Sequence, residues 1–368
     1  MIDWQRIWNE EDSVRRFSPL RAILRIFSLL YGLIVFVRNR LYDRRIFQSV
    51  KLSRPVISVG NITVGGTGKT PCVILLAQML KRQGFRPAVI SRGYGGSSKE
   101  PVNVVCDGKT ILLSSKTAGD EPLLIARSLT NIPVITGPKR ELTGQAAIDR
   151  FGADVLICDD AFQHRRLHRD IDIVLLDGRR PLGNGRLLPR GELRESPAGL
   201  NRASCFILTR ADETLPPDER IARTARQAGI PVFSAAHRFS EIYSPATGVR
   251  LQPREILDKK ICAFCGIAKP ESFKSLLADA GAQILSFNPF PDHYIFSRTD
   301  IDELKQQFIA LKADYIVTTE KDAMRLADYP DFYNLIVVAR MEMEIRNVES
   351  FENFIAARAT APALRGTP

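Results

Sequence analysis

A glycine-rich turn that ends in lysine and threonine is the feature that most constrains this chain. It lies between an apolar run at 55–60 and a helical pattern at 69–82, and it consists of Gly65, Gly66, Thr67, Gly68, Lys69 and Thr70. A strand, a glycine turn and a helix N-terminus in this order present backbone N–H groups to phosphate, while the lysine neutralises charge and the threonine can hold Mg²⁺. The segment therefore predicts binding of a nucleoside triphosphate.

One position departs from the usual pattern G-x-x-x-x-G-K-[ST], because Thr63 stands where glycine is expected. Gly65 and Gly66 supply flexibility slightly later, so we keep Thr63 among the expected nucleotide-binding residues. A chance glycine turn between a strand and a helix is the alternative. It does not explain why Lys69 and Thr70 directly follow the last glycine.

Alternating strand and helix patterns begin at residue 55. Strands are expected at 55–60, 87–91, 102–106, 132–136, 154–159 and 171–177, and helices at 69–82, 121–130 and 138–151. This alternation predicts a P-loop NTPase-like α/β fold with a mostly parallel sheet and ligand sites at the carboxyl ends of its strands.

A second, smaller α/β series follows an irregular, Arg/Gly/Pro-rich stretch that ends near 202. It runs from a strand at 204–209 to one at 314–318, with a hairpin-like region at 236–252 and a helix at 300–312 that Thr299 and Asp302 are expected to cap. We predict an N-terminal helical segment at 1–50, a P-loop core at 51–200, a second domain at 201–350 that completes an active-site cleft, and a C-terminal tail at 351–368.

The N-terminal segment is basic and apolar at once. Residues 16–54 contain nine Lys and Arg against one acid, and they flank an uncharged run at 26–37. That run, about 18 Å long as a helix, is shorter than the ~30 Å hydrocarbon core, and an extension toward Phe17 includes Arg21 and Arg25. An interfacial helix on an anionic membrane surface is therefore favoured over nucleic-acid binding, with a buried core helix as the alternative.

Two adjacent acids, Asp159 and Asp160, end an apolar strand. Neighbouring carboxylates are costly unless a cation lies between them, so we expect them to bind metal beside the glycine turn; a polar strand end is the alternative. On residue types alone, Asp120 indicates a helix cap and His293, in a proline-rich loop, a structural histidine.

Three weaker signals point elsewhere. Cys262 and Cys265 have metal-ligand spacing but lie in an apparent buried strand, so a reduced protein without a zinc site is expected. The run Thr209–Asp212 is similar to the guanine-reading motif of GTPases, yet Arg210 replaces its lysine. The glycine turn is also similar to that of membrane-recruited ATPases, but Val64 stands in place of their extra lysine.

Six motifs occur in the order of one family: 58–71, 91–95, 119–122, 159–164, 188–191 and 290–293. Together they resemble the signature of tetraacyldisaccharide 4′-kinase, the lipid A 4′-kinase of Gram-negative bacteria. The resemblance extends from the basic helix to about residue 325, and Ala161, where the family more often has glycine, is a small departure.

The resemblance implies an ATP- and Mg²⁺-dependent lipid kinase at the cytoplasmic face of the bacterial inner membrane. Its substrate would be an acylated glucosamine disaccharide 1-phosphate, phosphorylated at the 4′-hydroxyl. The family's catalytic base and its histidine partner match Asp120 and His293, which reverses both structural interpretations. Arg140 and Arg190 would offset the charge of ATP or of the substrate phosphate.

Two other function classes stay open on the sequence. A regulatory, membrane-recruited ATPase would transfer phosphate to water and would not need His293. A soluble small-molecule kinase would stay active without residues 1–45.

Overall fold

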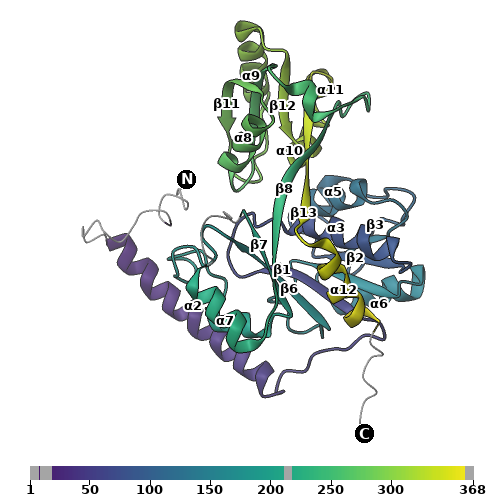
Figure 1. Ribbon diagram of the computed structural model, residues 1–368, viewed down its shortest axis with the longest axis vertical. Coiled ribbons are helices and arrows are strands. Elements are labelled where there is room, and N and C mark those ends of the chain that lie inside the picture. The colour runs from purple at the N-terminus through teal and green to yellow at the C-terminus, as the bar shows by residue number, and fades with distance from the viewer. Residues whose placement is uncertain (1–7, 9–18, 211–217, 361–368) are drawn as a thin grey trace. The chain divides into compact units, whose positions relative to one another are not determined.

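The computed structural model describes residues 8, 19–210 and 218–360, and these fall into two compact units. Unit 1 combines Met1–Arg92, Gly137–Ala236 and Ile345–Pro368, and unit 2 combines Gly93–Thr136 and His237–Glu344 (Figure 1). Each unit is thus built from separate stretches of chain, whereas the sequence suggested consecutive domains. The boundaries at residues 50, 200 and 350 stay a prediction.

Unit 1 contains a parallel sheet whose strands are almost entirely buried. Their spatial order is β8 (Val232–Tyr243, from its first half), β7 (Cys205–Thr209), β6 (Ile171–Asp177), β1 (Val56–Asn61), β5 (Val155–Asp159) and β2 (Pro87–Ser91). Every residue of β1, β2, β5, β6 and β7 is buried, as expected for parallel strands covered on both faces.

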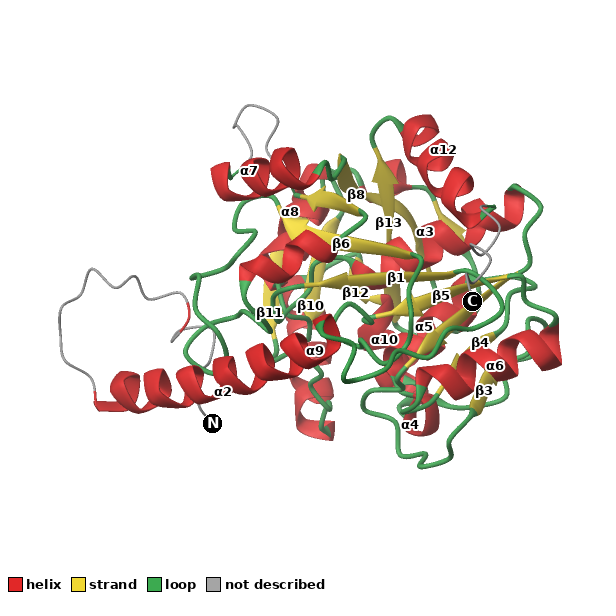
Figure 2. Cartoon of the chain, turned by 90° about the horizontal axis from the view of Figure 1, so that it is seen from below, coloured by secondary structure: helices red, strands yellow, loops and turns green. Residues whose placement is uncertain are grey.

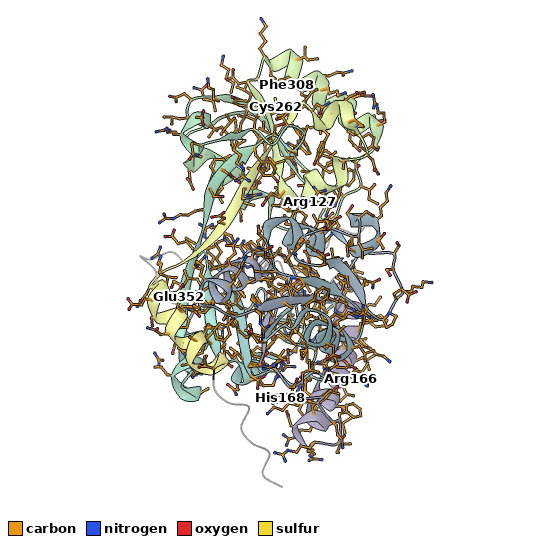
Figure 3. All side chains as sticks on the ribbon, turned by 90° about the vertical axis from the view of Figure 1, so that its right-hand side faces the viewer. Arg127, Arg166, His168, Cys262, Phe308 and Glu352 are labelled. Carbon is orange, nitrogen blue, oxygen red and sulfur yellow. The ribbon has the colours of Figure 1, made fainter. Side chains whose placement is uncertain are left out.

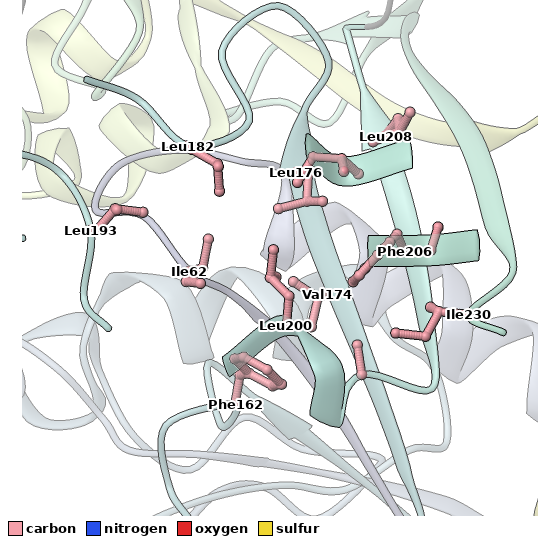
Figure 4. Packing of buried hydrophobic residues seen from close by; sticks show 13 residues of the cluster. Ile62, Phe162, Val174, Leu176, Leu182, Leu193, Leu200, Phe206, Leu208 and Ile230 are labelled. Carbon is pink, nitrogen blue, oxygen red and sulfur yellow. The ribbon is translucent and has the colours of Figure 1, made fainter. Parts of the chain in front are cut away.

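Helices cover this sheet. Helix α3 (Lys69–Arg82) packs on β1, β2 and β5, and α6 (Arg140–Phe151) packs on β2 and β5. The other helices of unit 1 are α2 (Pro19–Asp43), the 3₁₀ helix η1 (Pro197–Arg202), α7 (Glu219–Ala228) and α12 (Val348–Ala359). Figure 4 shows one core cluster, in which Ile62 and Phe162 meet side chains of β6 and β7. The predicted α/β class and mostly parallel sheet are confirmed.

Unit 2 has its own parallel strands, in the order β11 (Gln283–Pro289), β10 (Lys260–Cys265), β12 (Tyr315–Thr319) and β13 (Ile336–Ile345). Its antiparallel pairs are β3 (Asn103–Cys106) with β4 (Val134–Thr136), and the end of β8 with β9 (Arg250–Leu251). Its helices are α4 (Ser115–Ala118), α5 (Asp120–Ser128), η2 (Pro253–Ile256), α8 (Pro270–Asp279), α9 (Arg298–Leu311), α10 (Glu320–Leu326) and α11 (Pro330–Tyr333). Cys262 and Cys265 are buried in β10, where Figure 3 labels Cys262.

The cap of helix α9 differs from the prediction. Ser297, not Thr299, is the N-cap, and it exchanges hydrogen bonds with Asp300 in a capping box. The buried residues on either side explain this choice, because Phe296 and Ile301 belong to one core cluster and fix where the helix begins. Helix α12 occupies the first part of the segment predicted as a C-terminal tail and ends at Ala359; residues 361–368 lie outside the described part.

Helix α2 is one continuous helix (Figure 2). It is 25 residues long, and its two faces differ in burial. Leu24, Ser28 and Val35 are buried against the protein. Ten large apolar side chains on the remaining surface are 46–68% exposed: Leu20, Ile23, Ile26, Phe27, Leu29, Leu30, Leu33, Ile34, Phe36 and Val37. By length and composition the helix could cross a membrane, and little of its apolar window is buried in the protein.

Candidate active site

The glycine turn of unit 1 has the backbone that its sequence predicts. Gly65 and Gly68 have φ values of 106° and 88°, which side-chain-bearing residues rarely adopt. Gly68 is the N-cap of α3, so the helix begins at Lys69 and its first N–H groups point into the turn. Thr63 instead forms an antiparallel bridge with Leu193, an extended position that does not require glycine.

Side chains from two strand ends hold this turn. At the end of β1, Asn61 Nδ2 donates to Thr67 Oγ1 at 3.0 Å. After β7, Thr209 Oγ1 donates to the Thr67 carbonyl at 3.3 Å and Arg210 Nη2 to the Gly66 carbonyl at 2.9 Å. In the Thr209–Asp212 run, the first two residues thus support the turn; the last two lie outside the described residues.

The two acids lie beside the turn, as predicted. Asp159 ends β5 and is in register with Val59 of β1. Asp160, directly after the strand, has φ 46° and approaches Lys69 Nζ at 3.7 Å through Oδ1. Arg194 Nη1 donates to both oxygens of Asp160, at 2.7 and 2.9 Å. Burial alone would raise the pKa of Asp160, but Lys69 and Arg194 hold it below its usual range.

The predicted arginines occupy different positions near these acids. Arg140, the first residue of α6, is buried and donates through Nη2 to the carbonyls of Asp159 and Asp160, at 3.1 and 3.2 Å. Its guanidinium therefore fixes the backbone that carries both carboxylates. Arg190 is also buried, in the segment that leads to Arg194. The arginine that binds the Asp160 carboxylate is Arg194, from the Arg/Gly/Pro-rich stretch, which was not among the predicted site residues.

The segment 187–195 connects this site to helix α2. Ser28 Oγ donates to the Leu187 carbonyl at 2.9 Å, and Tyr31 OH donates to the Arg194 carbonyl at 2.7 Å. Glu195 has no exposed surface, and its carboxylate accepts hydrogen bonds from three side chains: Asn39 at 3.2 Å, Gln163 at 2.9 Å and Arg202 at 2.8 Å. Helix α2 is thus part of the scaffold behind Arg194.

A second group of charged residues lies in unit 2 and contains both predicted catalytic residues. Asp120 is the first residue of α5, and its Oδ2 lies 3.8 Å from His293 Nδ1. His293 has φ 60°, and its ring meets that of Tyr94 edge-on, with 6.0 Å between centroids. The interpretation of Asp120 as a side-chain cap is wrong, because Gly119 is the N-cap and the carboxylate turns instead to His293 and Arg325.

Two cations from α10 complete this group, and the sequence had not singled them out. Arg325 Nε donates to Asp120 Oδ2 at 2.7 Å. Lys321 Nζ lies 3.1 Å from Glu121 Oε1 and 3.2 Å from His293 Nε2. Burial raises the pKa of Asp120, but His293 and Arg325 outweigh it and lower the pKa.

Metal binding was predicted for Thr70, Asp159 and Asp160, and the donor set fits Mg²⁺. This ion is usually bound by one or two carboxylates, phosphate oxygens and water, and these hydroxyl and carboxylate groups are hard oxygen donors. Within the described residues, no three His, Cys, Asp or Glu side chains cluster as a complete metal site. The remaining ligands of an ion held here would therefore come from phosphate and water.

Comparisons with known proteins identify the family of this chain. A family model described as Tetraacyldisaccharide-1-P 4′-kinase matches residues 20–360. The tetraacyldisaccharide 4′-kinase of Syntrophus aciditrophicus (strain SB) is 46% identical over 361 residues, covering 95% of this chain and 96% of the relative. That of Geobacter metallireducens is 38% identical over 334 residues, covering 91% and 97%.

A solved structure is similar as well. It is described as the "apo" form of LpxK from Aquifex aeolicus in complex with ATP. It has a TM-score of 0.75 and 32% sequence identity, and the match covers 92% of this chain and 99% of that one. The agreement of the glycine turn, the full-length relatives and this fold leads to one conclusion: the chain belongs to the tetraacyldisaccharide 4′-kinase family of ATP-dependent phosphotransferases.

Proposed function

We propose that this chain transfers the γ-phosphoryl group of ATP to the 4′-hydroxyl of an acylated glucosamine disaccharide 1-phosphate, with Asp120 as the base. The observation that carries the proposal is the 3.8 Å approach of Asp120 to His293, from segments that are far apart in the sequence. An alcohol acceptor must lose its proton as the new P–O bond forms, and an acid–histidine pair is suited to accept that proton.

We assign the triphosphate to unit 1. The N–H groups at the start of α3 and Lys69 would bind its phosphates. Thr70, Asp159 and Asp160 would hold Mg²⁺, which would neutralise phosphate charge during transfer. Lys69 could then exchange its present partner Asp160 for phosphate, because Asp160 would still be paired with Arg194.

The remaining predicted residues have supporting roles in this proposal. Gly65, Gly66, Thr67 and Gly68 would bring the backbone close to phosphate, with Thr63 at the entry of the turn. Arg140 would act through the backbone of the acid pair, in line with its hydrogen bonds to the Asp159 and Asp160 carbonyls. Arg190 would offset the charge of a substrate phosphate.

We further propose that helix α2 lies in the cytoplasmic surface of the bacterial inner membrane. Its polar residues Ser28, Tyr31 and Asn39 form hydrogen bonds with the rest of the protein, while its exposed surface is apolar and flanked by arginines, the reverse of a soluble surface helix.

Ile34→Asp should lower binding to anionic vesicles roughly tenfold or more. Val249→Asp, an equally exposed apolar site outside α2, should leave binding unchanged. Equal binding by both variants would favour the soluble-kinase alternative.

The central experiment follows phosphate transfer from ATP with Mg²⁺ to the acylated disaccharide 1-phosphate in detergent micelles. Asp120→Asn and His293→Gln should lower kcat about 10²–10⁴-fold, the usual contribution of a general base, and leave ATP affinity unchanged. Asp302→Asn, at an exposed surface pair, serves as the matched control. Release of phosphate to water with no labelled lipid would support the regulatory ATPase instead.

A further inference from the structure

Lys321 and Arg325 belong to the charged group of unit 2 around Asp120 and His293, and no sequence motif assigned either of them. They lie four positions apart on α10, so both side chains leave the same face of the helix. Their side chains are only 16% and 9% exposed, and the other residues of α10 are buried or half-buried. Lysine and arginine are seldom this buried unless they are paired. Both reach the residues around His293, so their burial has a specific target.

One nitrogen of the Arg325 guanidinium is anchored by Asp322 and Gly266, and the other two contact Asp120 and His293. Its Nη1 donates to Asp322 Oδ1 at 3.2 Å and to the Gly266 carbonyl at 3.4 Å. Its Nε donates to Asp120 Oδ2 at 2.7 Å, and its Nη2 lies 3.2 Å from His293 Nδ1. The planar guanidinium thus bridges the two residues and sets their distance.

The anchor of Arg325 is itself fixed in the core. Asp322 has no exposed surface, accepts a hydrogen bond from Thr319 Oγ1 at 2.6 Å and accepts another from the Gly266 backbone N–H at 3.0 Å. These hydrogen bonds fix the position of Asp322 and, through it, that of the Arg325 guanidinium. Asp120 and His293 are therefore positioned by Arg325.

Lys321 contacts the other side of the imidazole. Its Nζ lies 3.2 Å from His293 Nε2, 3.1 Å from Glu121 Oε1 and 3.4 Å from Asp292 Oδ1. Two carboxylates hold the ammonium group in place, one from the first turn of α5 and one from the residue before the histidine.

The chemistry of these groups restricts the proton on the ring. Arginine and lysine only donate, and a neutral imidazole has one accepting nitrogen, so only one of the two cations can donate to it at a time. Each ring nitrogen also faces a carboxylate, Asp120 at 3.8 Å from Nδ1 and Asp292 at 4.0 Å from Nε2. When Nδ1 accepts from Arg325, Nε2 carries the proton toward Asp292.

We propose that Arg325 and Lys321 are positioning residues for phosphoryl transfer: Arg325 aligns the Asp120 carboxylate with His293, and Lys321 controls which ring nitrogen accepts a proton. The inference rests on the role of Asp120 as the base under the proposed function.

The charges around Asp120 support this assignment. The groups that face the pair are Glu121 from α5, Asp292 from its loop, Asp322, Lys321 and Arg325 from α10, and the ring of Tyr94. Burial raises the pKa of Asp120, and His293 with Arg325 lowers it overall. Loss of Arg325 therefore moves this pKa upward, so the carboxylate needs a higher pH to accept a proton.

The test is the pH dependence of kcat/KM for micellar lipid phosphorylation in Arg325→Gln and Arg325→Lys. Arg325→Gln should lower kcat about a hundredfold, as expected for a misplaced base, and move the acidic limb of the profile to higher pH, with ATP affinity unchanged. Arg325→Lys keeps the charge, so the limb should stay near its original pH while part of the rate is lost, because one ammonium cannot bridge both partners. Lys321→Met should lower kcat by a smaller factor.

The controls remove similar charges elsewhere in unit 2. Arg298→Gln and Lys116→Met break exposed ion pairs and should keep the original rate and profile. Arg325→Gln should add little to the defect of Asp120→Asn, since it acts through that carboxylate. An unmoved acidic limb, or additive losses in the double variant, would overturn the inference.

The outcomes also separate this inference from the proposed function. If Asp120→Asn keeps its turnover, the base assignment fails and the inference fails with it. If Asp120→Asn is inactive but Arg325→Gln is normal, only the inference fails. If Arg325→Gln does not fold, Arg325→Lys provides the test. A shift of its acidic limb away from the original pH would contradict the inference, because this variant keeps the positive charge.

Discussion

Asp160 in unit 1 and Asp120 in unit 2 are surrounded alike, yet their second partners differ in kind. Each carboxylate accepts a hydrogen bond from an arginine at 2.7 Å, and each has a depressed pKa against the effect of burial. The next neighbour of Asp160 is Lys69, a permanent cation at 3.7 Å. That of Asp120 is His293, an imidazole whose Nδ1 lies 3.8 Å away.

This difference separates two kinds of chemistry. A carboxylate between lysine and arginine stays charged and can only exchange partners, which suits a site that holds phosphate and metal. A carboxylate beside an imidazole can pass a proton on, which suits removal of a proton from an alcohol. Variants of the two sites should therefore fail in different ways.

Among the variants that probe unit 1, the largest effect is expected for Lys69→Met. The change removes the cation next to the helix N-terminus that would bind phosphate, so kcat should fall roughly 10²–10³-fold and ATP affinity should fall with it. Calorimetric titration with ATP and Mg²⁺, beside turnover, measures both; Lys51→Met, at an exposed position, is the control. If Lys69→Met kept its ATP affinity, the two sites would no longer be distinguished, because Asp120→Asn is also expected to keep its ATP affinity.

The buried Glu195 carboxylate behind the unit 1 site should also contribute to the stability of the fold. Glu195→Ala removes a fully buried carboxylate and leaves Arg202, which is stacked over the Phe162 ring, without its anion. Stability should fall by about 2–3 kcal/mol in urea unfolding, because a mostly buried cation loses its partner. Arg223→Ala, which breaks an exposed pair with Glu219, should cost less than about 0.5 kcal/mol. Similar losses in both variants would contradict the buried network.

Contiguous signals made most of unit 1 predictable. The glycine turn and Asp159 each follow a buried strand, and parallel neighbours β1 and β5 bring those strand ends to the same edge of a sheet. Such sites can be recognised from one sequence because each strand carries its own polar end.

The cluster of unit 2 could not be assembled in that way. Lys321 and Arg325 are 200 and 205 positions from their partners Glu121 and Asp120, and two cations four apart on a helix usually indicate only a solvated face. Arg194 was missed for a similar reason, since its loop gave no sign that its guanidinium turns to Asp160. Only long-range packing distinguishes these cations from ordinary surface charges.

The smallest effect is expected for His164 of unit 1, whose Nε2 lies 3.8 Å from Glu141 Oε2. Burial, and to a smaller extent the positive charge of Arg140, lower the pKa of His164 from its ordinary 6.5 to about 4. Between these values the unfolded chain binds a proton that the folded chain does not, so this histidine makes the fold less stable as pH falls through the window. Because the ring is partly solvated, His164→Gln should recover only about 1 kcal/mol of the stability lost between about pH 7 and pH 5. Urea unfolding at several pH values measures it. Parallel curves for His164→Gln and the unchanged protein would show that burial of His164 does not set its charge.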